Sequence, residues 1–196
     1  MTARQTALHR QAARKRPELP ARPVEIVYSV AVSLDGYIAD ERGGVDWLHA
    51  AMVKGEGYGL AAFMSRIDAV MMGSRTYEQS VQMGGRMGPS LPCWVFSRRE
   101  LPSGKGVHVT AAQPSEVVST LPSHGVRCAW LMGGGTLAAS FFADGLIDEL
   151  SIAVMPVLLG SGIPLLGKLR NTVPLRLVES VTYKGGALGL RYVPAR

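Results

Sequence analysis

Cysteine is scarce in this sequence, which has only Cys93 and Cys128 among 196 residues. Both stand in apolar runs typical of strands, which predicts buried thiols in a reducing compartment rather than a disulfide. The four histidines are scattered, and no group of ligand residues has the spacing of a metal site, so we expect no metal. The sequence also lacks an apolar run long enough to cross a membrane and the apolar core of a secretory signal. We therefore expect a soluble, cytoplasmic protein with no membrane partner.

A concentrated basic patch is absent as well, although the net charge is +6. Six basic residues and one acid fall within residues 1–22, so this stretch carries a net charge of +5 and the rest of the chain only +1. The basic residues of the rest are dispersed, which argues against a nucleic-acid partner. We expect residues 1–22 to form a disordered basic tail without a function of its own, and residues 23–196 to form a single domain.

Apolar segments of strand length alternate with segments compatible with helices. Residues 23–33 are rich in β-branched side chains and predict a buried central strand, and apolar residues at the 3–4 spacing of a helix predict an amphipathic helix over residues 56–67. Ser74 is expected to cap a short helix. Strands are further expected over residues 68–72, 93–96, 107–110, 126–132 and 148–156, helices over 115–121 and 136–143, an irregular loop over 157–166, and a terminal hairpin over 175–183 and 188–193. This order predicts an α/β fold of three layers, α/β/α, with a mostly parallel mixed sheet and an antiparallel C-terminal hairpin.

Gly133, Gly134 and Gly135 connect the strand at 126–132 to the helix at 136–143. Glycines allow backbone N–H groups to approach an anion closely, and the helix that follows adds unpaired N–H donors and the positive end of its dipole. The pyrophosphate of a dinucleotide fits such a junction. The alternative is a glycine turn that only allows the helix to pack on the sheet, and this stretch alone does not decide between the two.

Four clusters that are rich in glycine or in polar residues follow the carboxyl ends of predicted parallel strands. Open α/β sheets bind ligands at this edge. We therefore expect the clusters to surround one crevice, which favours a cofactor at the triple glycine. The clusters are residues 33–36 with Ser33 and Asp35, residues 73–76, Ser97 with Arg98, and residues 133–135.

In this order the clusters resemble those of the dihydrofolate-reductase-like superfamily, and within it the RibD C-terminal domain, the reductase part of a bacterial bifunctional deaminase-reductase. The matching segments span nearly everything after residue 22, and the ordered set is more specific than any one of them. They are SLDGYIAD at 33–40, DAVMMGSRTYE at 68–78, VFSR at 95–98, LMGGGTLAASFFADGLIDEL at 131–150 and PVLLGSGIPLL at 156–166.

The resemblance implies a dihydrofolate-reductase-like fold with NADPH as the cofactor. Similar proteins join two glycines of the loop by a cis peptide. The usual Gly-Arg-x-Thr-Tyr pattern stands here as Gly-Ser-Arg-Thr-Tyr, with Arg75 one place late, so we expect Arg98 to make more of the contact with a 2′-phosphate, to which the arginine fork is suited. The implied pyrophosphate residues are Gly133, Gly134, Gly135 and Thr136, and the implied residues of the adenosine end are Gly73, Arg75, Thr76, Ser97 and Arg98.

Two carboxylates are candidates for contact with a substrate. Asp35 follows the first strand, where the resemblance places the nicotinamide and the substrate, and we expect it to make a polar contact with a heterocycle. Its alternative is an ordinary Asp-Gly turn. Glu56 stands close to the position of the substrate-binding acid of folate reductases. Its alternative, which we favour, is a stabilising charge in the first turn of a helix.

The leading hypothesis is an NADPH-dependent reductase of a pterin- or pyrimidine-like heterocycle, either the aminouracil of the riboflavin pathway or a dihydrofolate-like substrate. The second hypothesis is a non-catalytic nucleotide-binding protein of the same fold. A Rossmann dehydrogenase would need an acid at the end of the strand after the glycine loop, and residues 151–155 contain none. The sequence leaves the oligomeric state open, with a homodimer among the options.

Overall fold

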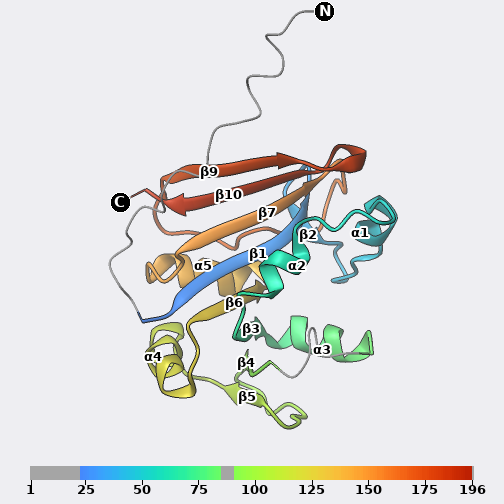
Figure 1. Ribbon diagram of the computed structural model, residues 1–196. Helices are drawn as coiled ribbons and strands as arrows, with labels where there is room; N and C mark the ends of the chain where they lie inside the picture. Colours follow the sequence, from blue (N-terminus) through green and yellow to red (C-terminus); the bar gives the residue numbers. More distant parts are fainter. Residues whose placement is uncertain (1–22, 85–90, 196) are drawn as a thin grey trace, which may run out of the picture.

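The computed structural model describes residues 23–84 and 91–195, so the predicted basic tail lies outside the described residues. Figure 1 shows a central sheet with helices on both of its faces. In chain order the helices and strands are β1 (Glu25–Ser33), β2 (Tyr37–Ala39), α1 (Asp46–Ala51), α2 (Leu60–Met64), β3 (Ala69–Gly73), α3 (Ser74–Gln82), β4 (Cys93–Phe96), β5 (Val107–Thr110), α4 (Pro114–Thr120), β6 (Cys128–Gly133), α5 (Gly135–Ala143), β7 (Glu149–Met155), β8 (Ile163–Pro164), β9 (Leu175–Thr182) and β10 (Leu188–Pro194).

Eight strands form the main sheet in the order β5-β4-β3-β6-β1-β7-β10-β9. The six strands from β5 to β7 in this order pair in parallel with their neighbours. β10 pairs antiparallel with both β7 and β9, so the C-terminal hairpin forms one end of the sheet. The expected mostly parallel mixed sheet with its antiparallel hairpin is confirmed.

Successive residues of the central strands face opposite sides of the sheet. In β1, Ile26 and Tyr28 join a core that also contains side chains of α4 and α5, whereas Val27 joins a second core with Phe63 of α2 and Tyr77 of α3. The strands are therefore apolar on both faces, as a parallel sheet covered by helices requires. This arrangement confirms the three layers α/β/α.

The connection between β1 and β3 differs from the prediction. The helix expected over residues 56–67 is wrong, because only α2 is helical there and α1 lies before it. Gly55 and Gly59 have φ of +80° and +72°, and Tyr58 has φ of +47°. An α-helix requires φ near about −60°, so these residues turn the chain instead of continuing a helix. The expected cap at Ser74 is also wrong, since Gly73 is the N-cap of α3 and no side chain caps that helix.

The segment after β7 contains a short strand within the expected irregular loop. β8 pairs antiparallel with β2 and forms a second, two-stranded sheet. This pairing brings residues 163–164 against the turn that follows β1. The segment after β7 therefore lies at the carboxyl edge of the main sheet.

Candidate cofactor and substrate site

The carboxyl ends of β1, β3, β4 and β6 lie at one edge of the sheet because these strands are parallel neighbours. Gly73 pairs with Phe96, so the residues that follow β3 and β4 begin side by side. All four sequence clusters therefore stand along one edge (Figure 1). The chain leaves β3 to form α3 on one face of the sheet and leaves β6 to form α5 on the other. Where the connections after two neighbouring strands run to opposite faces of the sheet, a crevice forms between them, and α/β proteins bind ligands in it.

The three glycines of the loop after β6 have three different environments. Gly133 has φ of +122°, a conformation that favours glycine, and a cis peptide joins it to Gly134. Gly134 is extended, with φ of −78° and ψ of −177°, and a Cβ there would meet nothing closer than the Thr76 hydroxyl at 3.9 Å. Gly135 is packed so tightly that a Cβ would overlap the carbonyl oxygen of Pro164. The open space of the loop is thus at Gly134.

Two helix N-termini meet beside Gly134. α3 begins after Gly73 and α5 begins after Gly134, and neither helix has a side-chain cap. A Cβ on Gly73 would lie 3.9 Å from both the Gly133 oxygen and the Gly134 nitrogen, which shows how near the two termini are. The first N–H groups of each nine-residue helix lack intrahelical partners, and the dipoles add positive potential. The pair of termini, with Thr136 exposed at the start of α5, is suited to a pyrophosphate.

Arg75 and Arg98 both carry exposed guanidinium groups at this edge. Neither has a hydrogen bond or ion pair to a residue that the structure describes, whereas the neighbouring Arg99 pairs with Glu78 of α3 at 3.1 Å. The Ser97 hydroxyl accepts a bond from the Arg99 N–H and donates one to the Arg99 oxygen, so it shapes the turn after β4. Two arginines are therefore available to an anionic ligand.

Asp35 lies in the turn after β1, and its carboxylate is already bonded. Oδ1 accepts a bond from the Ser33 hydroxyl at 2.6 Å, and Oδ2 accepts one from the N–H of Gly160 at 2.7 Å. The N–H of Leu159 is shared between the two oxygens. The Ser33 bond is the main cause that lowers the pKa of Asp35, with smaller contributions from the backbone N–H groups. Ser33 is only 1% exposed and also accepts a bond from the Tyr37 N–H, so its hydroxyl supports the turn.

Glu56 lies outside any helix, in the turn before α2, so its interpretation as a first-turn charge is wrong. One oxygen accepts a bond from the Gly57 N–H and the other accepts one from the Lys184 N–H in the turn between β9 and β10. The Lys184 bond is the main cause that lowers the pKa of Glu56. These contacts join Glu56 to the hairpin at the β9 end of the sheet, whereas Asp35 contacts the segment after β7.

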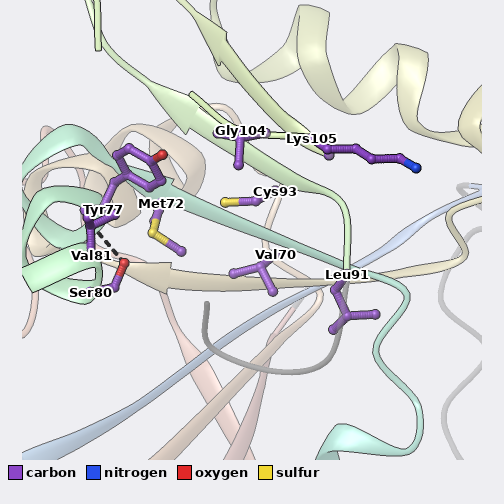
Figure 2. A pocket seen from close by; sticks show the side chains of 11 residues that line it. Val70, Met72, Tyr77, Ser80, Val81, Leu91, Cys93, Gly104 and Lys105 are labelled. Carbon is purple, nitrogen blue, oxygen red and sulfur yellow. Dashed lines mark hydrogen bonds between the residues drawn. The ribbon is translucent and has the colours of Figure 1, made fainter. Parts of the chain in front are cut away.

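A cavity of about 270 Å³ lies away from this edge. Figure 2 shows Cys93, Val70 and Met72 on its floor and Tyr77 and Val81 of α3 at its side. Cys93 begins β4, so the cavity lies toward the amino ends of the strands. Burial raises the pKa of the Cys93 thiol to about 11, so it is neutral near pH 7. The lining is mainly apolar and includes none of the predicted site residues.

The part of the site that the sequence did not predict is the close packing of the segment after β7 against the glycine loop. The N–H of Gly167 donates to the Gly135 oxygen at 2.8 Å, and the Tyr28 hydroxyl donates to the Leu165 oxygen at 2.6 Å. The only sequence signal was the spacing of glycines in residues 160–167, because backbone contacts leave no side-chain pattern.

Comparison with known proteins places the chain in a family. The family described as the RibD C-terminal domain matches residues 24–188. The chain belongs to this RibD C-terminal domain family. The Bacillus subtilis (strain 168) protein named uncharacterized protein YwjB is 37% identical over 176 residues, which cover 86% of this chain and 97% of YwjB.

Solved structures share the fold of this RibD C-terminal domain. A Shewanella sp. PV-4 protein named "putative riboflavin biosynthesis protein" superposes with a TM-score of 0.80 at 29% identity, covering 88% of this chain and all of that protein. The dihydrofolate reductase of Enterococcus faecalis, solved with NADP(H), has a TM-score of 0.62 at 16% identity and covers 88% and 97% of the two chains. The dihydrofolate-reductase-like fold is thus confirmed.

No helix among residues 23–84 and 91–195 is long and apolar enough to span a membrane. Within the same ranges, no three His, Cys, Asp or Glu side chains gather as metal ligands would.

Proposed function

We propose that this protein is an NADPH-dependent reductase of a pyrimidine- or pterin-like heterocycle. The observation that carries the proposal is the open space at Gly134 between two uncapped helix N-termini, with two arginines at the same edge that have no partner among the described residues. A structural glycine turn requires neither the space nor the unpaired donors. Membership of the RibD C-terminal domain family supports the same function.

The residues of the edge fit the parts of NADPH in order. The N–H groups at the starts of α5 and α3, with Gly134 and Thr136, are suited to the pyrophosphate. Arg98 and Arg75 are suited to the 2′-phosphate, since a guanidinium fork makes paired, charge-assisted bonds to phosphate oxygens. When bound, the cofactor supplies a hydride, and the protein has to align it with the acceptor.

The heterocycle would lie toward the ends of β1 and β2, beyond the nicotinamide. Asp35 and Glu56 stay as predicted substrate contacts. Both carboxylates have lowered pKa values, so near pH 7 each is an ionised hydrogen-bond acceptor and not a proton donor. A ring N–H or amino group of an aminopyrimidine is the kind of donor that an ionised carboxylate binds.

The test is NADPH consumption by the purified chain with a panel of aminopyrimidines, including 5-amino-6-(5-phosphoribosylamino)uracil, and of dihydropterins. We expect consumption that matches the amount of reduced product, with NADPH preferred over NADH. Thermal stabilisation by NADPH without consumption with any acceptor would favour the second hypothesis, a non-catalytic nucleotide-binding protein. Absence of both stabilisation and consumption would refute the cofactor site itself.

A further inference from the structure

Residues 157–167, here called the tether, connect the turn after β1 to the glycine loop. At the first end, Val157 accepts a bond from the Leu34 N–H at 2.8 Å, and Asp35 accepts bonds from the N–H groups of Leu159 and Gly160. The carboxylate is the only side chain among these bonding groups. The first end of the tether is therefore fixed largely through Asp35.

The middle of the tether is held by strand pairing and close backbone packing, by the Tyr28 hydroxyl, which donates to the Leu165 oxygen, and by the Leu165 side chain, which packs against the core. β8 pairs with β2, and a Cβ on Gly162 would overlap the carbonyl oxygen of Ala39. The Leu165 N–H donates to the Gly36 oxygen at 2.9 Å. The tether is thus held by contacts along its length as well as at its ends.

At the second end, the tether packs on the start of α5. The oxygens of Pro164 and Leu165 occupy the space where Gly135 would carry a side chain, and the Gly167 N–H donates to the Gly135 oxygen. A Cβ on Gly167 would come within 3.0 Å of the Thr136 Cα. A displacement of this end would move Gly135 and Thr136, whose N–H groups face the proposed pyrophosphate.

We infer that Asp35 is a positioning residue that holds the pyrophosphate loop in place through the tether. This inference rests on the proposed function, because the loop is a binding element only if a cofactor binds there. Asparagine at position 35 would keep the size of the side chain but would replace one carboxylate oxygen by an NH2 group, which is a donor and would face the Ser33 hydroxyl or the backbone N–H groups, all of which donate in this structure. The first end of the tether would then become more mobile. Because the backbone of the tether packs against Gly135, the glycine loop would become more mobile as well.

The test compares the full-length wild type with Asp35→Asn and with a matched control, Asp40→Asn. Asp40 accepts N–H bonds from Arg42 and Gly44 at 2.8 and 2.7 Å in the next turn, but it has no bond to the tether. Amide hydrogen exchange without cofactor should speed up in Asp35→Asn over residues 157–162 and also over 163–167 and 133–138. The control should leave exchange in the last two ranges unchanged. Faster exchange confined to residues 157–162 would overturn the inference.

Cofactor binding gives the second measurement. Loss of the charged hydrogen bonds should raise the NADPH Kd about tenfold, measured without heterocycle so that the predicted contact of Asp35 with the substrate does not affect the result. Gly167→Ala alters the other end of the tether and should weaken NADPH similarly, and the double variant should lose less than the sum of both. It also serves as the test if Asp35→Asn does not fold. Additive losses, or an effect of Asp35→Asn only on kcat, would overturn the inference.

Failure of the proposed function would look different. A wild type that does not bind NADPH refutes the cofactor site, whereas exchange in the cofactor-free protein still reports whether Asp35 controls the glycine loop.

Discussion

Replacing Gly134 by Asp should abolish NADPH binding without harming the fold. The backbone of Gly134 is extended, and a Cβ would meet only the Thr76 hydroxyl at an ordinary distance of 3.9 Å. Position 134 is the N-cap of α5, where aspartate is favoured and differs from glycine by only a few tenths of a kcal/mol. For a chain of this size that corresponds to a change in Tm below about 2 °C.

The effect on the cofactor should be far larger. Two unit charges roughly 4 Å apart repel by about 4 kcal/mol at an effective dielectric constant of about 20. This is close to a thousandfold rise in Kd. At an NADPH concentration of about 100 times the wild-type Kd, binding stabilises the folded state by about 2.7 kcal/mol, and after a thousandfold loss by less than about 0.1 kcal/mol. The wild-type Tm should therefore rise by roughly 5–11 °C, and that of the variant should not move measurably.

The assay is a pair of melting curves, with and without NADPH, for the wild type, Gly134→Asp and Gly134→Asn. The asparagine variant has the same size without the charge and separates repulsion from obstruction. Gly135→Ala is the opposite control, because a Cβ there overlaps the Pro164 carbonyl and should lower the Tm of the cofactor-free protein. A Gly134→Asp protein that keeps the wild-type shift would refute the cofactor site, and one that also melts far below the wild type would indicate a structural glycine turn.

Two further predictions concern charge. Arg98→Ala should weaken the binding of NADPH by about 1.5–3 kcal/mol and leave the binding of NADH nearly unchanged, as measured by titration of both cofactors. Equal losses would contradict a contact of Arg98 with the 2′-phosphate, and a larger selective loss in Arg75→Ala would assign that contact to Arg75. The pKa of Asp35 is lower in the folded protein than its ordinary value of 3.8, so its stabilising effect is complete above that value and is lost as the pH falls through the folded pKa. The Tm difference between wild type and Asp35→Asn should thus be constant from about pH 5 to 8 and shrink below about pH 4; a difference that stays constant at lower pH would contradict this linkage.

The main sheet could be predicted from the sequence because its strands are continuous apolar runs. The expected strands over residues 93–96 and 107–110 coincide with β4 and β5, and the expected run over 126–132 falls within one or two residues of β6. Parallel strands that are buried on both faces can be recognised from their β-branched and apolar composition, without knowing which strands they pair with. Their common direction then placed the glycine and arginine clusters at one edge.

The connections could not be predicted in the same way. β2 and β8 have three and two residues, and each is stabilised by a partner more than a hundred positions away in the chain. Glu56 was misplaced because apolar residues at helical spacing continue through residues 60–67, whereas the positive φ values of Gly55 and Gly59 interrupt the backbone. Apart from the bond from the Ser33 hydroxyl, the bonds that occupy Asp35 come from the backbone N–H groups of Leu159 and Gly160. Every residue but proline carries such a group, so no pattern of side chains indicates these bonds.

Because Gly135 is tightly packed, its presence in a relative of this protein does not by itself indicate that the relative binds a nucleotide. The main-chain oxygens of Pro164 and Leu165 exclude any side chain at that position in the protein without cofactor. Selection on folding would therefore retain Gly135 in a lineage that had stopped using a nucleotide, and Gly133, with its positive φ, would be retained for a similar reason. Gly134 is under no such constraint, so it would drift to other residues once the cofactor was lost. If the proposed cofactor site is correct, the residue at this middle position should separate homologues that kept a nucleotide from those that kept only the fold.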